Sequence, residues 1–551
     1  MTGPLSGRQA LVAGGLVAAG AVVLTLTLWP DGDGPAGGGP GERDRTDVTP
    51  PAATTPVSPS APHSDDPSPR PSPSSYPLSR APSVIPAVRE HKAARGPGWR
   101  PADGGRVVVA KADAERLADE GRLLAGELKL AYREGVKARA GDVELALVSG
   151  KANREAYTLS VKDRRARISG TGEAGVFYGT RTLKQAVRAD GTAPEGVVRD
   201  RPAKPQRGFM LDTARKHFTA RWIESRVREL ADLKYNQLGL HFSDDQAFRI
   251  ESDSHPEVVS AQRLTKAEVR RIVDLAARLH ITVIPEIDSP GHLGAVLKAH
   301  PDLQLRDTRG QPARGAVDIS KPGAARIVDD LLSEYAELFP GAYWHLGADE
   351  YLALTVRDPE ASYPQLARLA REKYGPGARV RDLATGWLND RADEVRQYGK
   401  QPKAWNDGFF RGGTVAAAGD IEVEYWTGKE LGAREPLEYL NAGRKLVNLN
   451  DEYLYYVLGE PNEFRYPTGQ RIYEQWNPLV LRGSRPVPTR FDGQILGARL
   501  AVWCDLADAQ TPAQVAAGVR MPLRALAQKV WDPRQPSMPW AQFVRLAGKL
   551  D

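Results

Sequence analysis

The feature that most constrains the fold is a repeating pattern that runs from Gln206 to the end of the chain. Short apolar runs, such as Ile281-Thr-Val-Ile-Pro-Glu-Ile287, alternate with amphipathic stretches of helical spacing, such as residues 265–279. A near-continuous apolar run is typical of a strand that is buried on both faces, as in parallel sheets. About eight such strand and helix units predict an α/β fold, a (β/α)8 TIM barrel, over residues 204–551.

Polar side chains follow the predicted strands at the points where the strands end. In a (β/α)8 barrel these ends meet at one face, which holds the active site. Carboxylates and an arginine beside aromatic rings suit a sugar, because rings stack on its C–H faces and its hydroxyls need polar partners. The endings are Asp212-Thr-Ala-Arg215, Ser243-Asp-Asp-Gln246, Glu286-Ile-Asp-Ser-Pro-Gly-His292, Asp349-Glu350, Trp405-Asn-Asp407, Trp426, Asn448 to Tyr455 and Trp503-Cys-Asp505.

Two adjacent carboxylates, Asp349 and Glu350, close the run that begins at Tyr343. Successive side chains of a strand point to opposite faces, so both can share one pocket only where the backbone turns. Repulsion and burial would then push their pKa values apart and let one hold a proton at neutral pH, as acid/base catalysis needs. The alternative is the start of a helix, where Asp-Glu favours the helix dipole. This segment alone does not decide between the two.

Residues 98–203 predict a small α+β domain before the barrel. Alternating apolar residues predict strands at 107–109, 143–147 and 157–161, and helical spacing predicts helices at about 112–132 and from residue 179. None of these segments indicates chemistry, so we expect a structural role.

The N-terminal residues differ in composition from the rest. After Arg8 the apolar run 9–29 carries no charge and is long enough to cross a bilayer, which predicts an uncleaved signal anchor over 1–29. A cleaved secretory signal is the alternative. Residues 30–97 are rich in Pro, Ser and Gly and predict a disordered linker. We therefore expect the folded domains at the extracellular face of the cell membrane, or secreted if the segment is cleaved.

Composition excludes several classes of protein. Cys504 is the only cysteine, so no disulfide within the chain is possible. The net charge of +6 is spread along the chain without basic blocks, which argues against a nucleic-acid partner. The nine histidines form no His-Glu-x-x-His zinc motif. The oligomeric state stays open.

The ordered set of motifs resembles the glycoside hydrolase family 20 β-N-acetylhexosaminidases. The resemblance covers roughly residues 100–540, and the segment 176–183 is similar to the family's domain before the barrel. The motifs that carry it are Leu211-Asp-Thr-Ala-Arg215, Asp244-Asp-Gln246, Pro285-Glu-Ile-Asp-Ser-Pro-Gly-His292 and His345-Leu-Gly-Ala-Asp-Glu350.

This resemblance implies hydrolysis of terminal β-linked N-acetylhexosamine from glycans by a retaining, substrate-assisted mechanism, without metal or cofactor. Glu350 would be the general acid, and Asp349 would orient the substrate's acetamide and stabilise the cationic cyclic intermediate. The other implied roles are support of Glu350 by Asp244 and His292, hydroxyl binding by Arg215, donation to the acetamide oxygen by Tyr453, and an acetamide pocket of Trp405, Trp503 and, more loosely, Trp387.

Three positions depart from the family pattern. Ala348 replaces a usual glycine, Tyr455 stands where an acidic or amide residue is common, and Asp505 stands where a glutamate is usual. The last two positions normally bind hydroxyls remote from the cleaved bond, so they put the preferred hexosamine in doubt and leave the reaction type alone. A tethered glycan-binding protein with an inactive barrel is the alternative function. The intact set of acidic residues and His292 argues against it, because binding alone needs no acid/base pair.

Overall fold

The computed structural model describes residues 75–551 except 152, 428–432 and 460–463. The predicted signal anchor, 1–29, and the linker as far as residue 74 lie outside the described residues. Within the described ranges, no helix has both the length and the apolar character that crossing a bilayer requires.

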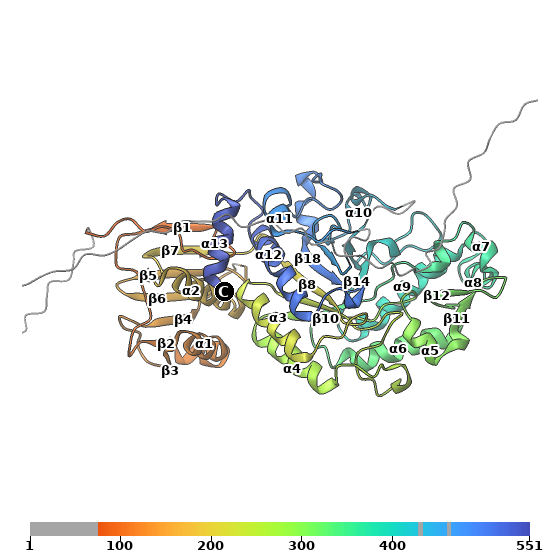
Figure 1. The fold of residues 1–551 in the computed structure, drawn as a ribbon, viewed down its shortest axis with the longest axis horizontal. Coiled ribbons are helices and arrows are strands. Elements are labelled where there is room, and N and C mark those ends of the chain that lie inside the picture. Colours follow the sequence, from red (N-terminus) through yellow and green to blue (C-terminus); the bar gives the residue numbers. More distant parts are fainter. Residues whose placement is uncertain (1–74, 152, 428–432, 460–463) are drawn as a thin grey trace, which may run out of the picture. The chain divides into compact units, whose positions relative to one another are not determined.

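A seven-stranded mixed sheet forms the first domain, with strand order β1-β7-β5-β6-β4-β2-β3 (Figure 1). The helices α1 (Ala114–Leu128) and α2 (Glu173–Asp190) pack against one another and against this sheet. The predicted small α+β domain before the barrel is confirmed. The strands are β1 (Glu90–Ala93), β2 (Arg106–Val109), β3 (Ala131–Glu134), β4 (Val143–Leu147), β5 (Tyr157–Lys162), β6 (Arg165–Gly170) and β7 (Gly196–Asp200).

The sheet takes in part of the predicted linker, so the boundary at residues 97 and 98 is wrong. Strand β1 pairs antiparallel with β7. Val84 and Ile85 are buried, and the Ile85 N–H donates to Gln185 Oε1 at 2.8 Å. Prolines and glycines dominate the composition of the whole segment and hide this short edge strand, whose partner lies about 100 residues further along the chain.

Eight parallel strands close into the barrel that the sequence predicts. Each pairs with the next in chain order, and the last pairs with both its predecessor and the first. Strand β17 (Tyr455–Val457) lies beside the last strand, parallel to it. The barrel strands are β8 (Gln206–Asp212), β9 (Gln237–His241), β10 (Thr282–Glu286), β13 (Tyr343–His345), β14 (Gln401–Trp405), β15 (Glu422–Tyr425), β16 (Leu446–Asn448) and β18 (Ile495–Trp503).

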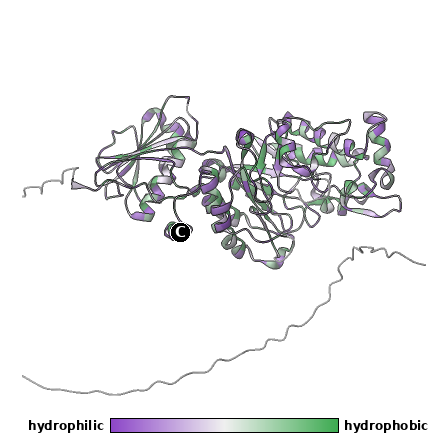
Figure 2. Ribbon diagram, turned by 90° about the horizontal axis from the view of Figure 1, so that it is seen from above, coloured by the Kyte–Doolittle hydropathy of each residue, from purple (hydrophilic) through white to green (hydrophobic). Residues whose placement is uncertain are grey.

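Amphipathic helices connect the strands, and many carry hydrophobic and hydrophilic residues in alternation along their turns (Figure 2). The predicted capping box of Thr265 and Glu268 begins α4. Helix α13 packs against α2, so the last residues of the predicted barrel domain contact the first domain. The helices are α3 (Ala220–Asp232), α4 (Lys266–Arg278), α5 (Gly294–Ala299), α6 (Pro322–Ala336), α7 (Pro359–Ser362), α8 (Pro364–Tyr374), α9 (Val380–Gln397), α10 (Pro436–Asn441), α11 (Gly469–Gln475), α12 (Pro512–Trp531) and α13 (Trp540–Leu550). A two-stranded sheet of β11 (Gln304–Arg306) and β12 (Pro312–Val317) lies between α5 and α6.

Strand register positions the polar strand ends. In the parallel ladder His241 is opposite Asp212 on one side and Glu286 on the other, and Glu286 is also opposite His345. The last residues of four neighbouring strands therefore lie at one level. Because parallel strands all point the same way, this level is the carboxyl face of the barrel.

The barrel interior also holds paired charges. Glu424 is fully buried, with its Oε1 2.9 Å from Arg499 Nη2 and 3.2 Å from Lys403 Nζ. Lys403 also contacts Glu422 at 2.8 Å. Burying a charge without a partner is costly, and these pairs remove most of that cost. The interior beneath the polar face is thus filled by side chains of opposite charge.

Candidate active site

The strand ends surround one pocket of about 240 Å³ at the carboxyl face of the barrel. Acidic, basic and aromatic side chains all contribute to its wall. The predicted site residues that line it are Arg215, Asp244, His292, Asp349, Glu350, Tyr455, Trp503 and Asp505. The further lining residues are His241, Asp288, Trp426, Thr427, Asp451, Val457 and Phe464.

A strained turn brings Asp349 and Glu350 to the same pocket. Three residues after β13 have left-handed φ angles, which are 70° at Gly347, 77° at Ala348 and 45° at Glu350. Two carboxyl groups hold the turn: Ala348 N–H donates to Asp288 Oδ1 at 3.0 Å, and Glu350 N–H donates to Asp407 Oδ2 at 3.1 Å. No helix begins at the pair, and the next helical turn starts at Leu352. The turn, and not a helix start, therefore explains the adjacent carboxylates.

Ala348 has a cost that the resemblance alone does not show. A left-handed conformation costs a non-glycine residue roughly 1–2 kcal/mol, which explains why glycine is usual at this position. The Ala348 methyl group also needs space. A Cβ added at Gly408 would lie 2.8 Å from it, so the glycine at 408 leaves room for the alanine at 348.

Asp244 is the centre of the positive groups in the pocket. Its Oδ2 lies 2.7 Å from Arg215 Nη2 and 2.9 Å from His241 Nε2, and its Oδ1 lies 3.3 Å from His292 Nδ1. Burial alone would raise the pKa of Asp244, but the hydrogen bonds from both histidines and the charge of Arg215 hold that pKa far below its usual value. The Asp244 carboxylate is thus ionised and positions three side chains from three different strands.

His292 connects Asp244 to the carboxylate pair. Its Nε2 lies 3.4 Å from Glu350 Oε2 and 3.7 Å from Asp349 Oδ2. Burial would lower the pKa of His292, but the charge of Asp349 and the hydrogen bonds to Asp244 and Glu350 raise it well above its usual value. The ring is an imidazolium that donates toward both sides.

The pKa values of the pair are split, as the sequence predicts. Burial raises the pKa of Asp349, and the charge of Glu350 adds to that effect, although His292 opposes it. The pKa of Glu350 is lowered, chiefly by its hydrogen bond with His292. The Glu350 side chain is 53% exposed, whereas that of Asp349 is 12% exposed. Burial thus favours the protonated form of Asp349, whereas the contact with His292 favours the anion of Glu350.

Three further carboxyl groups surround the pair, two of them buried and that of Asp407 partly buried. Glu286 accepts a hydrogen bond from Trp405 Nε1 at 2.7 Å, and the charges of His345 and His241 hold its pKa well below the usual value against the effect of burial. Burial and the charge of Asp349 raise the pKa values of Asp288 and Asp407 well above normal. The pocket therefore contains more carboxyl groups than cations to pair them, and such a pocket favours a positively charged guest.

Arg215 and Asp505 form one edge of the pocket. Arg215 Nη1 lies 3.1 Å from Asp212 Oδ2, and its guanidinium lies 5.4 Å from the centre of the Trp503 ring. Asp212 in turn accepts a hydrogen bond from the Cys504 N–H at 3.0 Å. This fixes the guanidinium with its remaining donors available, as hydroxyl binding requires. Asp505 is exposed beside it.

Three aromatic rings also line the pocket. Tyr455 and Trp426 are stacked, with ring centres 5.4 Å apart and an interplanar angle of 6°, and Trp503 lies 6.2 Å from Tyr455. Trp405 is fully buried behind this wall, 5.8 Å from Trp503, and does not line the pocket. Trp387 lies on α9 and donates to Ser289 Oγ at 3.0 Å, away from the lining residues. The lining role expected for both therefore stays a prediction, and a tryptophan at a strand end or on a helix can equally well pack inward.

The structure also places the two tyrosines differently from the expectation. Tyr453 is buried under the Arg471 guanidinium, 4.8 Å from its ring centre, and is not among the described residues that line the pocket. Tyr455 lines the pocket instead. Residues two apart share a face only in an extended strand, and β17 begins at Tyr455, with Tyr453 still in the preceding turn. The role assigned to Tyr453 is therefore not supported by its position.

Sequence reasoning missed several pocket residues. Asp288 lies inside a recognised motif and His241 just before another. Their positions near strand ends could have identified both as pocket residues. Trp426 belongs to the same series of strand ends. Asp407 also stands at a strand end, but nothing in the sequence marks it as a support for Glu350. Its hydrogen bond with the Glu350 N–H joins two strand ends that only the closed barrel brings together.

Comparisons with known proteins match both domains. Residues 205–534 match the family model described as glycosyl hydrolase family 20, catalytic domain, and residues 81–201 match glycosyl hydrolase family 20, domain 2. A lacto-N-biosidase of Bifidobacterium bifidum is 30% identical over 479 residues, covering 85% of this chain and 41% of that protein. A β-hexosaminidase of Porphyromonas gingivalis is 27% identical over 468 residues, covering 76% of this chain and 57% of that protein. The chain thus spans about half the length of these curated relatives.

Solved structures share the fold. A family 20 exo-β-N-acetylglucosaminidase of Vibrio harveyi in complex with N-acetylglucosamine superposes with a TM-score of 0.70 at 21% identity, covering 86% of this chain and 77% of that one. A mutant β-hexosaminidase of Streptomyces plicatus in complex with its product superposes with a TM-score of 0.68 at 24% identity, covering 86% and 95%. At these identities the likeness shows the fold alone.

The close approach at Gly347 leads to a prediction about the turn. A Cβ added there would lie 1.6 Å from Asp288 Oδ1. Gly347→Ala should displace the Asp349 and Glu350 side chains and lower kcat/KM by about 100-fold, since a shift of about 1 Å in a reacting group has that effect. Gly399→Ala is the matched control, because its φ of 71° is equally left-handed but no atom lies within 4 Å of the added Cβ. Steady-state kinetics of both variants check this, and equal losses in the two would contradict it.

Proposed function

Because the chain belongs to glycosyl hydrolase family 20, we propose that it is a β-N-acetylhexosaminidase, which removes terminal β-linked N-acetylhexosamine from glycans by a retaining, substrate-assisted mechanism. The observation that carries the proposal is the pair of Asp349 and Glu350 in one pocket, with their pKa values shifted in opposite directions. An inactive glycan-binding barrel would need neither the split pair nor the strained turn. Release of nitrophenol from a 4-nitrophenyl β-N-acetylhexosaminide tests the proposal directly.

The first step needs a proton on Glu350. In the empty pocket water and His292 favour its anion, but a sugar that covers the exposed side chain removes that water and raises its pKa. Glu350 then gives its proton to the glycosidic oxygen, and the bond from this oxygen to the anomeric carbon breaks. The acetamide oxygen of the same sugar forms a new bond to that carbon, which gives a cyclic cation.

The acidic pocket stabilises this cation. As positive charge develops on the acetamide, it favours the ionised form of Asp349, while the neighbouring Asp288, whose pKa is well above normal, keeps its own proton. Glu350, now a carboxylate, takes a proton from water as the water oxygen attacks the anomeric carbon. Tyr455 is placed beside Trp503 and Trp426 on the pocket wall, so its hydroxyl, and not that of Tyr453, is our candidate donor to the acetamide oxygen.

The substrate is open between two classes. Several curated relatives are named β-hexosaminidases, whereas the relative with 30% identity is named lacto-N-biosidase. Lacto-N-biosidase activity is therefore our second candidate. The departures from the family pattern at Tyr455 and Asp505 support it, because they alter the part of the pocket where hydroxyls are bound. Assays on N-acetylglucosaminides, N-acetylgalactosaminides and lacto-N-biosides distinguish the candidates.

Asp505 offers a direct test of substrate choice. Asp505→Glu restores the longer side chain usual in the family and should raise kcat/KM on plain N-acetylglucosaminides relative to the other substrates by about 10-fold or more, the value of a hydrogen bond to a charged group. Asp508→Glu is the control, because Asp508 is exposed three residues further on and does not line the pocket. Unchanged substrate ratios in the Asp505 variant would contradict this role.

The two carboxylates should fail in different ways. Glu350→Gln removes proton donation, so its loss of kcat/KM should be large for poor leaving groups and smaller for nitrophenolates, which depart with little protonation. Asp349→Asn removes charge stabilisation that is needed whatever the leaving group, so both substrate classes should suffer. A thiazoline made from N-acetylglucosamine should inhibit the wild type and bind the Asp349 variant more weakly.

Other results would exclude the scheme. A sugar trapped covalently on any carboxylate of the protein would show that this carboxylate, and not the acetamide, is the nucleophile. Full activity on a substrate whose acetamide is replaced by hydroxyl would show that the acetamide is not needed.

We further propose that the N-terminal segment holds the enzyme at the extracellular face of the cell membrane. The support is the uncharged run 9–29 followed by the proline-rich stretch, and both lie outside the described residues. Fractionation of cells that express the full-length chain should place it in the membrane fraction, accessible to protease from outside. Recovery in the cytoplasm, or a secreted form cut near residue 30, would contradict the anchor.

A further inference from the structure

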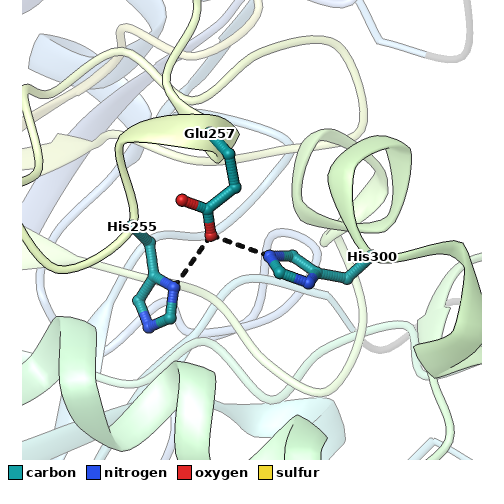
Figure 3. Close-up of side chains that lie close together, drawn as sticks. All are labelled: His255, Glu257 and His300. Carbon is teal, nitrogen blue, oxygen red and sulfur yellow. Dashed lines mark hydrogen bonds and ion pairs between the residues drawn. The ribbon is translucent and has the colours of Figure 1, made fainter.

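We infer that the protein has a binding site for a divalent transition-metal ion, of the Zn²⁺ class, formed by His255, Glu257 and His300. In Figure 3 the two imidazoles face the same carboxylate oxygen. Glu257 Oε1 lies 3.0 Å from His255 Nδ1 and 2.8 Å from His300 Nε2. The three ligand atoms all lie within 4.8 Å of one another. None of these residues takes part in the proposed catalytic pocket.

The separations suit a zinc ion after a small movement. Zinc binds imidazole nitrogen and carboxylate oxygen at about 2.0–2.1 Å in tetrahedral geometry, which sets ligand atoms about 3.3–3.5 Å apart. The two nitrogen-to-oxygen distances need to open by about 0.3–0.7 Å to reach this separation. The Glu257 side chain is 42% exposed, so it has room to move by this amount.

The backbone presents the two histidines in the same way. His255 has a φ of −135° and a ψ of 64°, and His300 has a φ of −123° and a ψ of 65°. Each is followed by a proline that begins a short 3-10 turn, Pro256–Val258 or Pro301–Leu303. One histidine lies in the connection from β9 to α4 and the other at the end of α5. The repeated His-Pro turn thus brings two imidazoles from separate segments toward one carboxylate.

The hydrogen-bond count leaves a place for an ion. Both ring nitrogens of His255 face carboxylates, because Nε2 lies 3.2 Å from Asp330 Oδ2 on α6. A neutral imidazole has one N–H and can donate to only one of them. If Nε2–H donates to Asp330, Nδ1 offers a lone pair toward Glu257, where two acceptors would face each other. A metal ion between them satisfies both, and the carboxylate behind the histidine is the usual support of a metal ligand.

The charges also balance around a dication. Within the described residues, the salt-bridge partners of Glu257 and Asp330 are the histidines alone, and no lysine or arginine is paired with either carboxylate. Two carboxylates and two neutral imidazoles match a charge of +2. Two nitrogen ligands favour zinc and its neighbours over Mg²⁺ or Ca²⁺, which prefer oxygen.

The position of the site gives the ion a mechanical role. Helix α5 begins just after His292 and ends just before His300, so its six residues, about 9 Å long, connect the catalytic pocket to the metal site. An ion would join the end of α5 to the connection from β9 to α4 and, through Asp330, to α6. We expect it to stabilise this part of the barrel without touching the substrate.

The test is zinc binding to the full-length protein without a histidine tag, after chelator treatment, by isothermal titration with ZnCl₂. We expect zinc to bind at this site, and His300→Gln should weaken that binding by more than about 10-fold. Asp330→Asn should weaken it by about 10–100-fold, the usual effect of losing a support of a metal ligand. His280→Gln is the matched control. Its Nε2 also lies 2.8 Å from a glutamate, Glu120, but among the described residues the pair has no third ligand.

The catalytic pocket contains further groups of His, Asp and Glu that can bind zinc, so the variants and not the wild type decide the outcome. The melting temperature should rise with zinc in the wild type and the His280 variant and rise less in the His300 variant, with circular dichroism confirming that each variant is folded. Anomalous scattering at the zinc edge should place an ion between the three ligands. No zinc binding, or equal zinc binding by the wild type and the His300 variant, would overturn the proposal.

Discussion

The contact of Asp244 with Arg215, His241 and His292 is the interaction on which the site depends. The buried Asp244 carboxylate contacts side chains from three successive strand units. Positive and negative groups continue to alternate beyond these contacts. His241 also contacts Glu286, and His292 also contacts the pair of Asp349 and Glu350. Each buried charge is tolerable only because the next has the opposite sign, so the groups form one electrostatic unit.

That unit is built into the barrel by register and by strain. Parallel pairing sets His241, Glu286 and His345 at one level, which a change of register would destroy. The left-handed turn after β13 then directs two successive side chains inward, at a conformational cost that hydrogen bonds from the turn to Asp288 and Asp407 offset. The excess of buried carboxyl groups, some of them protonated, prepares the pocket for a cation before any substrate is bound.

Sequence patterns predicted the barrel, the preceding α+β domain and most of the pocket, because each rests on local periodicity or on polar residues at strand ends. The differences between the expected and the observed positions share a cause. Tyr453 and Trp405 carry the right chemistry, but whether a side chain near a strand end faces the pocket depends on where the extended backbone begins and what packs behind it. Strand β1 was hidden for a similar reason, since only pairing with the distant β7 orders a proline-rich segment.

The sequence by itself determined which groups are available: adjacent carboxylates after an apolar strand, a histidine and an aspartate to support them, and aromatic residues for a sugar. The tertiary structure alone decided how those groups are ionised and which tyrosine faces the pocket, because burial and contacts between distant strands set pKa values and side-chain positions. It also brought His255, Glu257 and His300 together, three residues whose spacing forms no recognisable metal motif. Proximity of this kind arises only when the chain closes on itself.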